Sequence, residues 1–229
     1  MEIWLDSSDL NDATYFDAIG LINGITTNPK ILANSQGSPL TTLQKLLAVN
    51  QQPICVQVTA IHTDAIIAQA RHLRAISHRF IIKIQANECG FKAMKELVNE
   101  NIPVLSTAVF TAGQVLTSCK LNVDYIAPYL NHIKQSNQDW QKETQRMADI
   151  VDSFNCKSKL MMASIKSIDD IYYSMDIGAQ AVTAPSDVLR AFSEEPAQTS
   201  DALKIFSDNW ATVEDDLFGH QFTTHASGC

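Results

Sequence analysis

The sequence has none of the usual features of membrane or nucleic-acid-binding proteins. No apolar run approaches the roughly 18 residues of a membrane span, and no basic segment followed by an apolar core stands at the N-terminus. The 17 Lys and Arg are outnumbered by 25 Asp and Glu, which gives a net charge of -8, and the cationic residues do not cluster. We therefore expect a cytoplasmic protein whose partners are neither membranes nor nucleic acids.

Cysteine and histidine pairs with metal-binding spacing are also absent. The five cysteines are scattered without a CxxC pair, and the six histidines form no HxxxH or HExxH pair. An odd number of unclustered cysteines favours reduced structural thiols over a disulfide framework or a zinc site. We expect no dedicated metal site.

What the sequence does contain is a regular alternation of short apolar segments and amphipathic segments. The apolar segments, which are rich in β-branched residues and predicted to be strands, are 2–6, 24–28, 54–59, 80–85, 103–109, 125–129, 160–165 and 180–184. The segments between them, such as 63–76, repeat apolar residues at spacings of three and four, which predicts helices. This pattern predicts an α/β protein of the (β/α)8 TIM barrel class, with an open doubly wound sheet as the alternative.

An additional C-terminal helix is predicted over residues 199–217. Leu203, Phe206, Trp210 and Val213 form its apolar stripe. A barrel does not need this helix, so we expect it to cap the bottom of the barrel or to pack on another subunit. No linker interrupts residues 1–217, which predicts one domain, followed by a flexible tail over residues 218–229.

Polar residues stand at the ends of seven of the eight predicted strands. In a parallel barrel the C-terminal ends of all strands meet on one face, which brings distant residues together. The polar residues at these ends are Asp6, Thr26, Asn28, Gln57, Thr59, Lys83, Gln85, Thr107, Tyr129 and Ser164.

Lys83 is the most unusual of these residues because it stands inside the apolar segment FIIKIQ. Strand alternation places Lys83 on the inner face of the barrel and the bulky Phe80, Ile82 and Ile84 under the helices. An ordinary lysine is almost fully protonated at neutral pH, but partial desolvation favours the neutral amine, which can attack a carbonyl group. The alternatives are an ion pair with Asp6 or a lysine that extends from the strand end towards water.

Several motifs together resemble the small transaldolase family, which includes the fructose-6-phosphate aldolases. They are LDSSD at 5–9, GITTNPKIL at 24–32, VQVT at 56–59, IIKIQ at 81–85, STAVF at 106–110, APYLN at 127–131 and MASIK at 162–166. The resemblance covers about residues 1–217. It implies class I aldolase chemistry on a TIM barrel without a metal or an organic cofactor.

The resemblance also assigns roles to individual residues. It implies that Lys83 forms the Schiff base, that Asp6 is the acid beside it, and that Asn28 contacts the hydroxyl of the dihydroxyacetone donor. Gln57, Thr107 and Tyr129 are similar to the aldolase set that holds a catalytic water, whereas the transaldolases have a glutamate at the position of Gln57. An amide does not ionise, so Gln57 is not itself a base.

Two residues depart from the family pattern. His132 stands where the family has a phosphate-binding arginine, and Lys30 stands where a serine is usual. The acceptor is then expected to be an unphosphorylated aldehyde or a different sugar phosphate. The alternative is that phosphate still binds, held by Ser164 and Lys166 after the seventh strand.

We therefore expect a class I aldolase that cleaves or forms fructose 6-phosphate or a similar ketose. A transaldolase, which hands the dihydroxyacetone unit to a second aldehyde, is the first alternative, and a non-catalytic barrel that binds a sugar phosphate is the second. The predicted substrate-binding residues are Thr26, Asn28, His132, Ser164 and Lys166. The resemblance further implies a homo-oligomeric ring, a pentamer or a decamer, built through the C-terminal helix.

Overall fold

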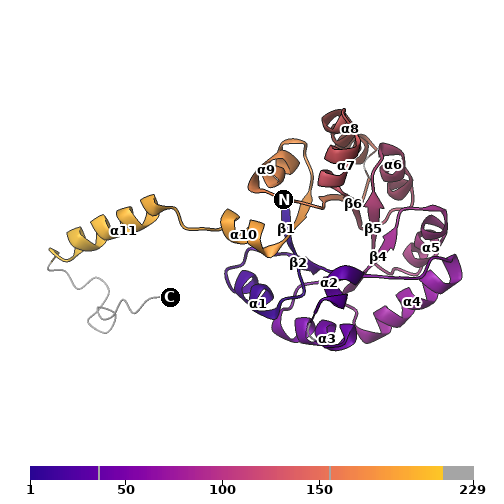
Figure 1. Ribbon diagram of the computed structural model, residues 1–229, viewed down its shortest axis with the longest axis horizontal. Coiled ribbons are helices and arrows are strands. Elements are labelled where there is room, and N and C mark those ends of the chain that lie inside the picture. The colour runs from indigo at the N-terminus through magenta and orange to yellow at the C-terminus, as the bar shows by residue number, and fades with distance from the viewer. Residues whose placement is uncertain (36, 155, 214–229) are drawn as a thin grey trace. The chain divides into compact units, whose positions relative to one another are not determined.

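The computed structural model describes residues 1–35, 37–154 and 156–213 and contains a closed barrel of eight parallel strands (Figure 1). The strands follow one another around the barrel in chain order, and β1 pairs with β8 to close it. They are β1 (Glu2–Asp6), β2 (Gly24–Thr26), β3 (Ile54–Gln57), β4 (Phe80–Gln85), β5 (Val104–Val109), β6 (Tyr125–Pro128), β7 (Lys159–Met162) and β8 (Ala181–Ala184). The predicted TIM barrel is therefore confirmed over the open sheet.

Helices surround the barrel, and two of the connections hold a pair of them (Figure 1). Both α2 and α3 follow β2, and both α7 and α8 follow β6. The helices of the barrel are α1 (Leu10–Ala18), α2 (Pro29–Ala33), α3 (Pro39–Val49), α4 (Thr63–Ile76), α5 (Glu88–Asn99), α6 (Ala112–Lys120), α7 (Leu130–Ser136), α8 (Trp140–Ser153), α9 (Ile168–Asp176) and α10 (Ser186–Phe192).

The chain divides into a barrel unit, residues 1–192, and a second unit that begins at Ser193. The second unit contains α11 (Ala197–Trp210), which begins directly after Pro196 and ends at an Ala211 cap. The predicted helix over 199–217 thus ends earlier than the pattern indicated. Residues 214–217 and the predicted tail, 218–229, lie outside the described residues, and the prediction of one domain over 1–217 stays a prediction.

Two apolar layers follow from strand alternation, and β4 shows both. Phe80, Ile82 and Ile84 are fully buried in the large core between the strands and the helices. Ile81 belongs to a smaller core inside the barrel, whose other members are Trp4, Cys55, Leu105, Ala127, Met161, Ala163 and Ala181. The inner face of β4 is therefore the one that carries Ile81 and Lys83, as the alternation predicted.

A polar and aromatic cluster closes the N-terminal end of the barrel. Trp4 and Tyr125 pack edge to face, with ring centroids 5.3 Å apart. Both donate hydrogen bonds to Glu2 Oε2, at 3.1 and 3.0 Å, while Lys159 pairs with the other oxygen. Burial raises the pKa of Tyr125, and the Glu2 carboxylate beside it raises the pKa further. Side chains therefore fill this end of the barrel.

Four predicted strands end earlier than their apolar patterns indicate, and the sixth strand does so by a single residue, at Pro128. The second ends at Thr26 because the Asn28 side chain caps α2 and Pro29 occupies its first turn. The third ends at Gln57, and Gln69 Oε1 then accepts hydrogen bonds from the backbone of Thr59 and Ala60. The seventh ends at Met162, and Ser164 turns the chain with a φ of +60°.

Gly24 makes room for Trp4, so we expect Gly24→Ala to destabilise the barrel. Trp4 and Gly24 are partners in register, and a Cβ at residue 24 would lie 2.3 Å from the indole ring. The overlap should lower the free energy of unfolding by about 1–3 kcal/mol, measured by urea denaturation. Gly113→Ala is the matched control: its Cβ would have only Thr111 Oγ1 nearby, at 3.8 Å, so stability should not fall. Equal stability of both variants would contradict the role given to Trp4.

Candidate active site

The C-terminal end of the barrel carries a layer of polar side chains just above the inner apolar core. Six of its seven members stand two residues after a residue of that core, so both residues of each such pair point into the barrel. The layer consists of Asp6, Gln57, Lys83, Thr107, Tyr129 and Thr183, together with Thr26 from β2. The structure thus brings together the five residues predicted to be catalytic.

Lys83 is buried in this layer, with 6% of its surface exposed. Its Nζ donates a hydrogen bond to the backbone oxygen of Thr27 at 2.9 Å. Among the ion pairs of the described residues there is none between Lys83 and Asp6, so the predicted structural ion pair is not what holds the lysine. A neutral carbonyl group positions the amine instead.

Asp6 is held by a chain of hydroxyl groups. Thr26 Oγ1 donates to Asp6 Oδ1 at 2.6 Å, and the same hydroxyl is 2.7 Å from Thr183 Oγ1. Because Thr26 gives its only hydroxyl proton to Asp6, it accepts from Thr183. The chain joins β1, β2 and β8 and fixes one carboxylate oxygen at the edge of the barrel mouth.

Thr107 and Tyr129 form a second hydroxyl pair on the other side of Lys83. Their oxygens are 3.0 Å apart. A register shift interrupts the pairing of β5 with β6 between Ser106 and Val109, and Ala108 has a φ of +56°, which is unusual for a residue with a side chain. The irregularity lies immediately after Thr107 and changes the direction of the chain where it reaches the barrel mouth.

An aromatic cluster borders the pair on the outside. The ring of Tyr129 lies 5.6 Å from that of Phe110 and 5.5 Å from that of His132, between centroids. His132 Nδ1 is 3.0 Å from Ser164 Oγ, so one of these two atoms donates to the other. The structure therefore brings His132 and Ser164 together at the rim.

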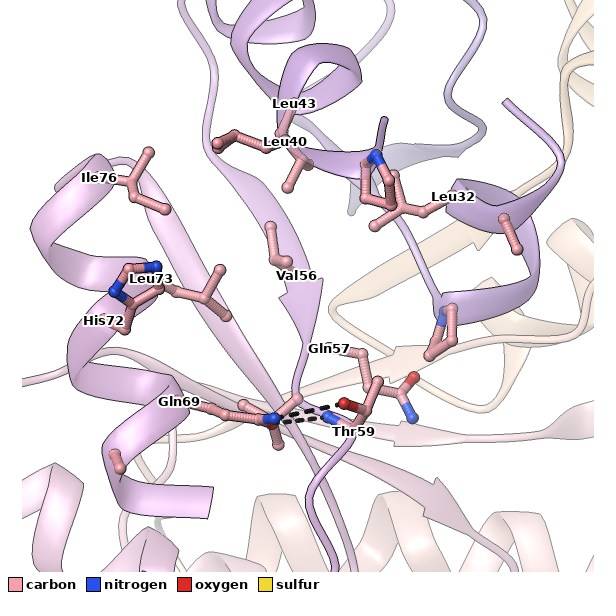
Figure 2. A pocket seen from close by; sticks show the side chains of 15 residues that line it. Leu32, Leu40, Leu43, Val56, Gln57, Thr59, Gln69, His72, Leu73 and Ile76 are labelled. Carbon is pink, nitrogen blue, oxygen red and sulfur yellow. Dashed lines mark hydrogen bonds between the residues drawn. The ribbon is translucent and has the colours of Figure 1, made fainter. Parts of the chain in front are cut away.

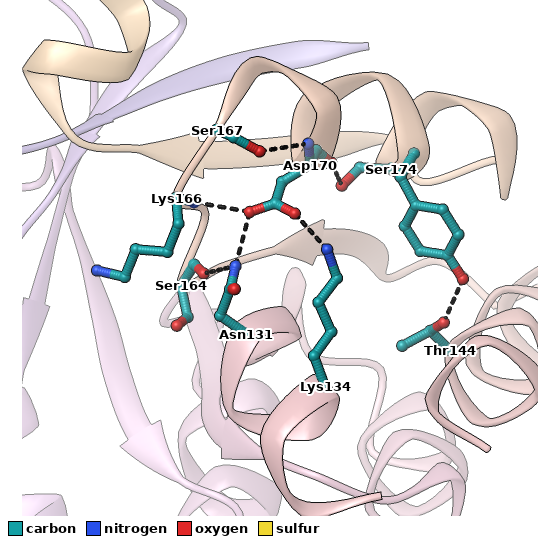
Figure 3. A network of polar contacts seen from close by, with 9 residues as sticks. Asn131, Lys134, Thr144, Ser164, Lys166, Ser167, Asp170 and Ser174 are labelled. Atoms are coloured by element: carbon teal, nitrogen blue, oxygen red, sulfur yellow. Dashed lines mark hydrogen bonds and ion pairs between the residues drawn. The ribbon is translucent and has the colours of Figure 1, made fainter. Parts of the chain in front are cut away.

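The remaining predicted residues lie in the loops above the strands. The side-chain oxygen of Asn28 accepts from the Ile31 amide at 2.9 Å, and its NH2 group makes no hydrogen bond with any part of the chain that the structure describes. Lys166 is exposed, and its side chain points away from Asp170 (Figure 3). Both groups are thus free to contact a ligand.

A buried carboxylate lies behind Ser164 and Lys166 (Figure 3). Asp170 Oδ2 accepts hydrogen bonds from Asn131 Nδ2 at 2.6 Å and from the Lys166 amide at 2.8 Å, and Lys134 pairs with Oδ1. Burial alone would raise the pKa of Asp170, but the bonds from Lys134, Lys166 and Asn131 outweigh it and hold the pKa below its usual range. Asp170 is therefore ionised at neutral pH.

The inner face of the barrel carries two side chains that could act as nucleophiles, Cys55 and Lys83, and Lys83 is the better candidate to attack a carbonyl group. Burial raises the pKa of the Cys55 thiol to about 12, so this neighbour is protonated at neutral pH. The described residues contain no group of three His, Cys, Asp or Glu side chains placed to hold a metal ion. None of the described helices has the length and the apolar character needed to cross a membrane.

A separate apolar groove lies outside the barrel between α2, α3 and α4 (Figure 2). Its volume is about 690 Å³, and Leu32, Leu40, Leu43, Val56, Leu73 and Ile76 line it. Val56 points outwards from β3, opposite to Cys55 and Gln57. Gln57, a member of the polar layer around Lys83, also lines the groove, so the groove reaches that layer at the end of β3 (Figure 2).

Sequence reasoning missed Thr183, Asn131 and Asp170. Thr183 follows Ala181 by two residues on the inner face of the eighth strand, so alternation alone could have identified it. Asn131 and Asp170 lie on helices, outside the strand ends where polar residues were sought, and no pattern in the sequence links them.

The sequence of the chain matches a known protein family. Residues 3–227 match the family described as transaldolase/fructose-6-phosphate aldolase. A probable transaldolase of Nitrosopumilus maritimus is 27% identical over 215 residues, which cover 93% of this chain and 96% of that protein. A probable transaldolase of Thermoplasma volcanium is 26% identical over 219 residues, 94% of this chain and 98% of that one.

The chain also resembles solved structures, but at low sequence identity, so the resemblance concerns the fold alone. A mandelate racemase/muconate lactonizing protein from Herpetosiphon aurantiacus superposes with a TM-score of 0.54 at 14% identity, over 80% of this chain and 54% of that one. A flavocytochrome b2 mutant with benzoylformate gives a TM-score of 0.55 at 10% identity, over 81% and 56%. The chain thus spans about half the length of these neighbours, which share its barrel architecture.

Proposed function

Because the chain belongs to the transaldolase/fructose-6-phosphate aldolase family, we propose that it is a class I aldolase that acts through a Schiff base on Lys83. Its substrate is fructose 6-phosphate or a similar ketose, made from a dihydroxyacetone donor and an aldehyde acceptor. The observation that carries the proposal is the buried amine of Lys83. It donates to the neutral carbonyl of Thr27 and forms no ion pair with a carboxylate of the described residues. An enzyme of the aldolase/transaldolase type is what the family match itself supports.

Lys83 attacks the ketose carbonyl carbon, and loss of water from the adduct leaves a protonated imine. Asp6 is placed to move the protons of these steps, since Thr26 fixes one carboxylate oxygen and leaves the other for the substrate. The imine then takes up the electron pair of the bond between its α and β carbons, while the hydroxyl on the β carbon loses its proton. The aldehyde leaves, and the enamine that remains is protonated and hydrolysed to dihydroxyacetone.

The proton of the β hydroxyl is transferred through a water molecule. Gln57 is the strand partner of Lys83 in the pairing of β3 with β4, but its amide does not ionise and can only orient the water. The Tyr129 hydroxyl, fixed by Thr107 at 3.0 Å, is placed to polarise it. The Asn28 NH2 group is a donor for the hydroxyls of the dihydroxyacetone unit.

The distal end of the ketose lies at the rim, where His132 and Ser164 meet. A histidine with a serine hydroxyl has no fork of donors like that of an arginine, so its hold on a phosphate is weaker. Lys166 supplies an exposed cation at the same rim. This combination favours an unphosphorylated aldehyde or a loosely held phosphate as the acceptor.

Transaldolase activity is the second candidate, and the names of the relatives favour it. Both relatives described above are named probable transaldolase. The Gln57 amide at the position of the transaldolase glutamate favours the aldolase, because transfer uses an ionisable group there. A non-catalytic barrel is the weakest alternative, since Lys83, Asp6 and Tyr129 are all present in one layer.

Borohydride reduction in the presence of dihydroxyacetone should trap an adduct on the peptide that carries Lys83. Reduction fixes the imine as a stable amine, which mass spectrometry detects. Lys83→Met, which keeps the apolar stem and removes the amine, should give no adduct and lose at least about a thousandfold of the activity. Lys166→Met is the matched control at the rim and should still form the adduct. A Lys83→Met variant that retains activity would sink the mechanism.

Release of free dihydroxyacetone separates the two candidate activities. We expect the protein to release it from fructose 6-phosphate without any acceptor aldehyde, because water reaches the enamine through the Gln57 and Tyr129 set. The measurement is a pair of enzymatic assays, for dihydroxyacetone and for glyceraldehyde 3-phosphate, with and without erythrose 4-phosphate. Glyceraldehyde 3-phosphate that appears only with erythrose 4-phosphate, and without free dihydroxyacetone, would assign the chain to the transaldolases instead, because the dihydroxyacetone unit then leaves on the erythrose 4-phosphate.

We further propose a homo-oligomer, a pentamer or a decamer, assembled through α11. Leu203, Ile205 and Phe206 on this helix are exposed. Exposed large apolar side chains gathered on one helix favour burial against a second copy. Phe206→Glu should therefore reduce the mass measured by sedimentation, whereas Asp208→Glu should leave it unchanged. The cytoplasmic location expected from the sequence stays a prediction.

A further inference from the structure

Asp170 is a buried carboxylate that the proposed chemistry does not use. It stands in the first turn of α9 with 3% of its surface exposed, and it accepts hydrogen bonds from three donors. Two donors, Asn131 and Lys134, belong to α7, and the third is the backbone of Lys166 in the loop after β7 (Figure 3). One side chain therefore ties two separate segments of the rim together.

Asn131 connects this carboxylate to Ser164. Its Nδ2 donates both to Asp170 Oδ2 at 2.6 Å and to the backbone oxygen of Ser164 at 2.8 Å. Ser164 has a φ of +60°, a conformation that costs free energy in a residue with a side chain and persists only where the surroundings impose it. The bonds to Asn131 and to the Lys166 amide hold the chain at and just after Ser164.

The imposed conformation decides where the Ser164 hydroxyl lies. From this position Ser164 Oγ meets His132 Nδ1 at 3.0 Å. His132 itself stands on α7, one residue after Asn131, so the same network fixes both members of the pair. We propose that Asp170 is a positioning residue, which acts through Asn131 and the Lys166 backbone to set the His132–Ser164 pair, where a phosphate on the ketose is loosely held. This inference rests on the proposed function.

Lys134 makes the carboxylate compatible with an anion nearby. A bare carboxylate close to the rim would repel a phosphate group. Lys134 pairs with Asp170 Oδ1 and also lies over the ring of Trp140, 4.7 Å from its centroid. The pair is neutral overall, so Asp170 orients the rim without repelling the substrate.

Asp170→Asn is the direct test. The substituted amide has one acceptor oxygen, so it keeps either the Lys134 bond at the former Oδ1 position or the Asn131 and Lys166 bonds at the former Oδ2 position. The bonds that remain also lose the negative charge of the carboxylate. We expect the KM for fructose 6-phosphate to rise by about tenfold, as befits one lost charge-assisted bond. The KM for unphosphorylated fructose, kcat at saturation and borohydride trapping of dihydroxyacetone on Lys83 should each change by less than about twofold.

Two further variants separate positioning from general stability. Asn131→Ala breaks the link to Ser164 but leaves the Lys134 and Lys166 bonds to Asp170, and it should give the same selective rise in KM. If circular dichroism shows that Asp170→Asn does not fold, the Asn131→Ala variant alone tests the positioning role. Asp124→Asn is the matched control, because Asp124 accepts from the Val104 amide at 2.8 Å before β6, at the opposite end of the barrel. It should change neither KM.

The outcomes distinguish this inference from the proposed function. In the first outcome, the wild-type protein traps dihydroxyacetone, but in the variants the KM values for fructose 6-phosphate and for fructose stay unchanged or rise equally. This result overturns the role of Asp170 and leaves the proposed aldolase activity intact. Wild-type protein that traps no dihydroxyacetone removes the aldolase, and the inference falls with it. A selective rise for the phosphorylated ketose in Asp170→Asn or Asn131→Ala, absent in Asp124→Asn, supports the positioning role.

Discussion

The burial of one amino group is the constraint on which the site depends. An ammonium group inside a protein costs several kcal/mol unless partners compensate for the lost water, and a carboxylate is the partner that would compensate most. In this barrel the contact of Lys83 Nζ is the Thr27 carbonyl oxygen, while Thr26 engages the carboxylate of Asp6. The arrangement keeps the acid and the amine in one layer without pairing them. A strong ion pair would hold the lysine in its charged, unreactive form.

The polar groups at the two ends of the barrel are satisfied to different degrees. At the N-terminal end, Glu2, Lys159, Trp4 and Tyr125 satisfy one another, so that end is stable and chemically closed. At the C-terminal end, some polar side chains use one atom in a hydrogen bond and keep another without a partner among the described residues. Asn28, for example, accepts a hydrogen bond through its side-chain oxygen, and its NH2 group makes none there. Stability thus resides in the lower layers, and the upper layer can keep unsatisfied groups for a ligand.

The sequence predicted the parts of the structure that follow from local patterns. Every strand except β7 begins within one residue of the first β-branched residue of its apolar segment, and alternation placed Lys83 inside the barrel. Strand ends were predicted less well, because the Asn28 cap and the turn at Ser164 override apolar residues that would otherwise continue the strand. The partner of Lys83 is a backbone oxygen, which no side-chain pattern reveals. Asp170 and Asn131 meet only because α7 and α9 are neighbours in space, which the sequence does not specify.

The filled N-terminal end has a consequence for the order of events. Because side chains fill that end, the substrates and products of the proposed reaction must enter and leave by the C-terminal end. In the proposed reaction the donor unit stays covalently attached to Lys83, and the aldehyde lies between Lys83 and the rim. The aldehyde would then depart before a water molecule or a second aldehyde can enter. Which of these two reaches the attached donor unit first would decide between hydrolysis and transfer.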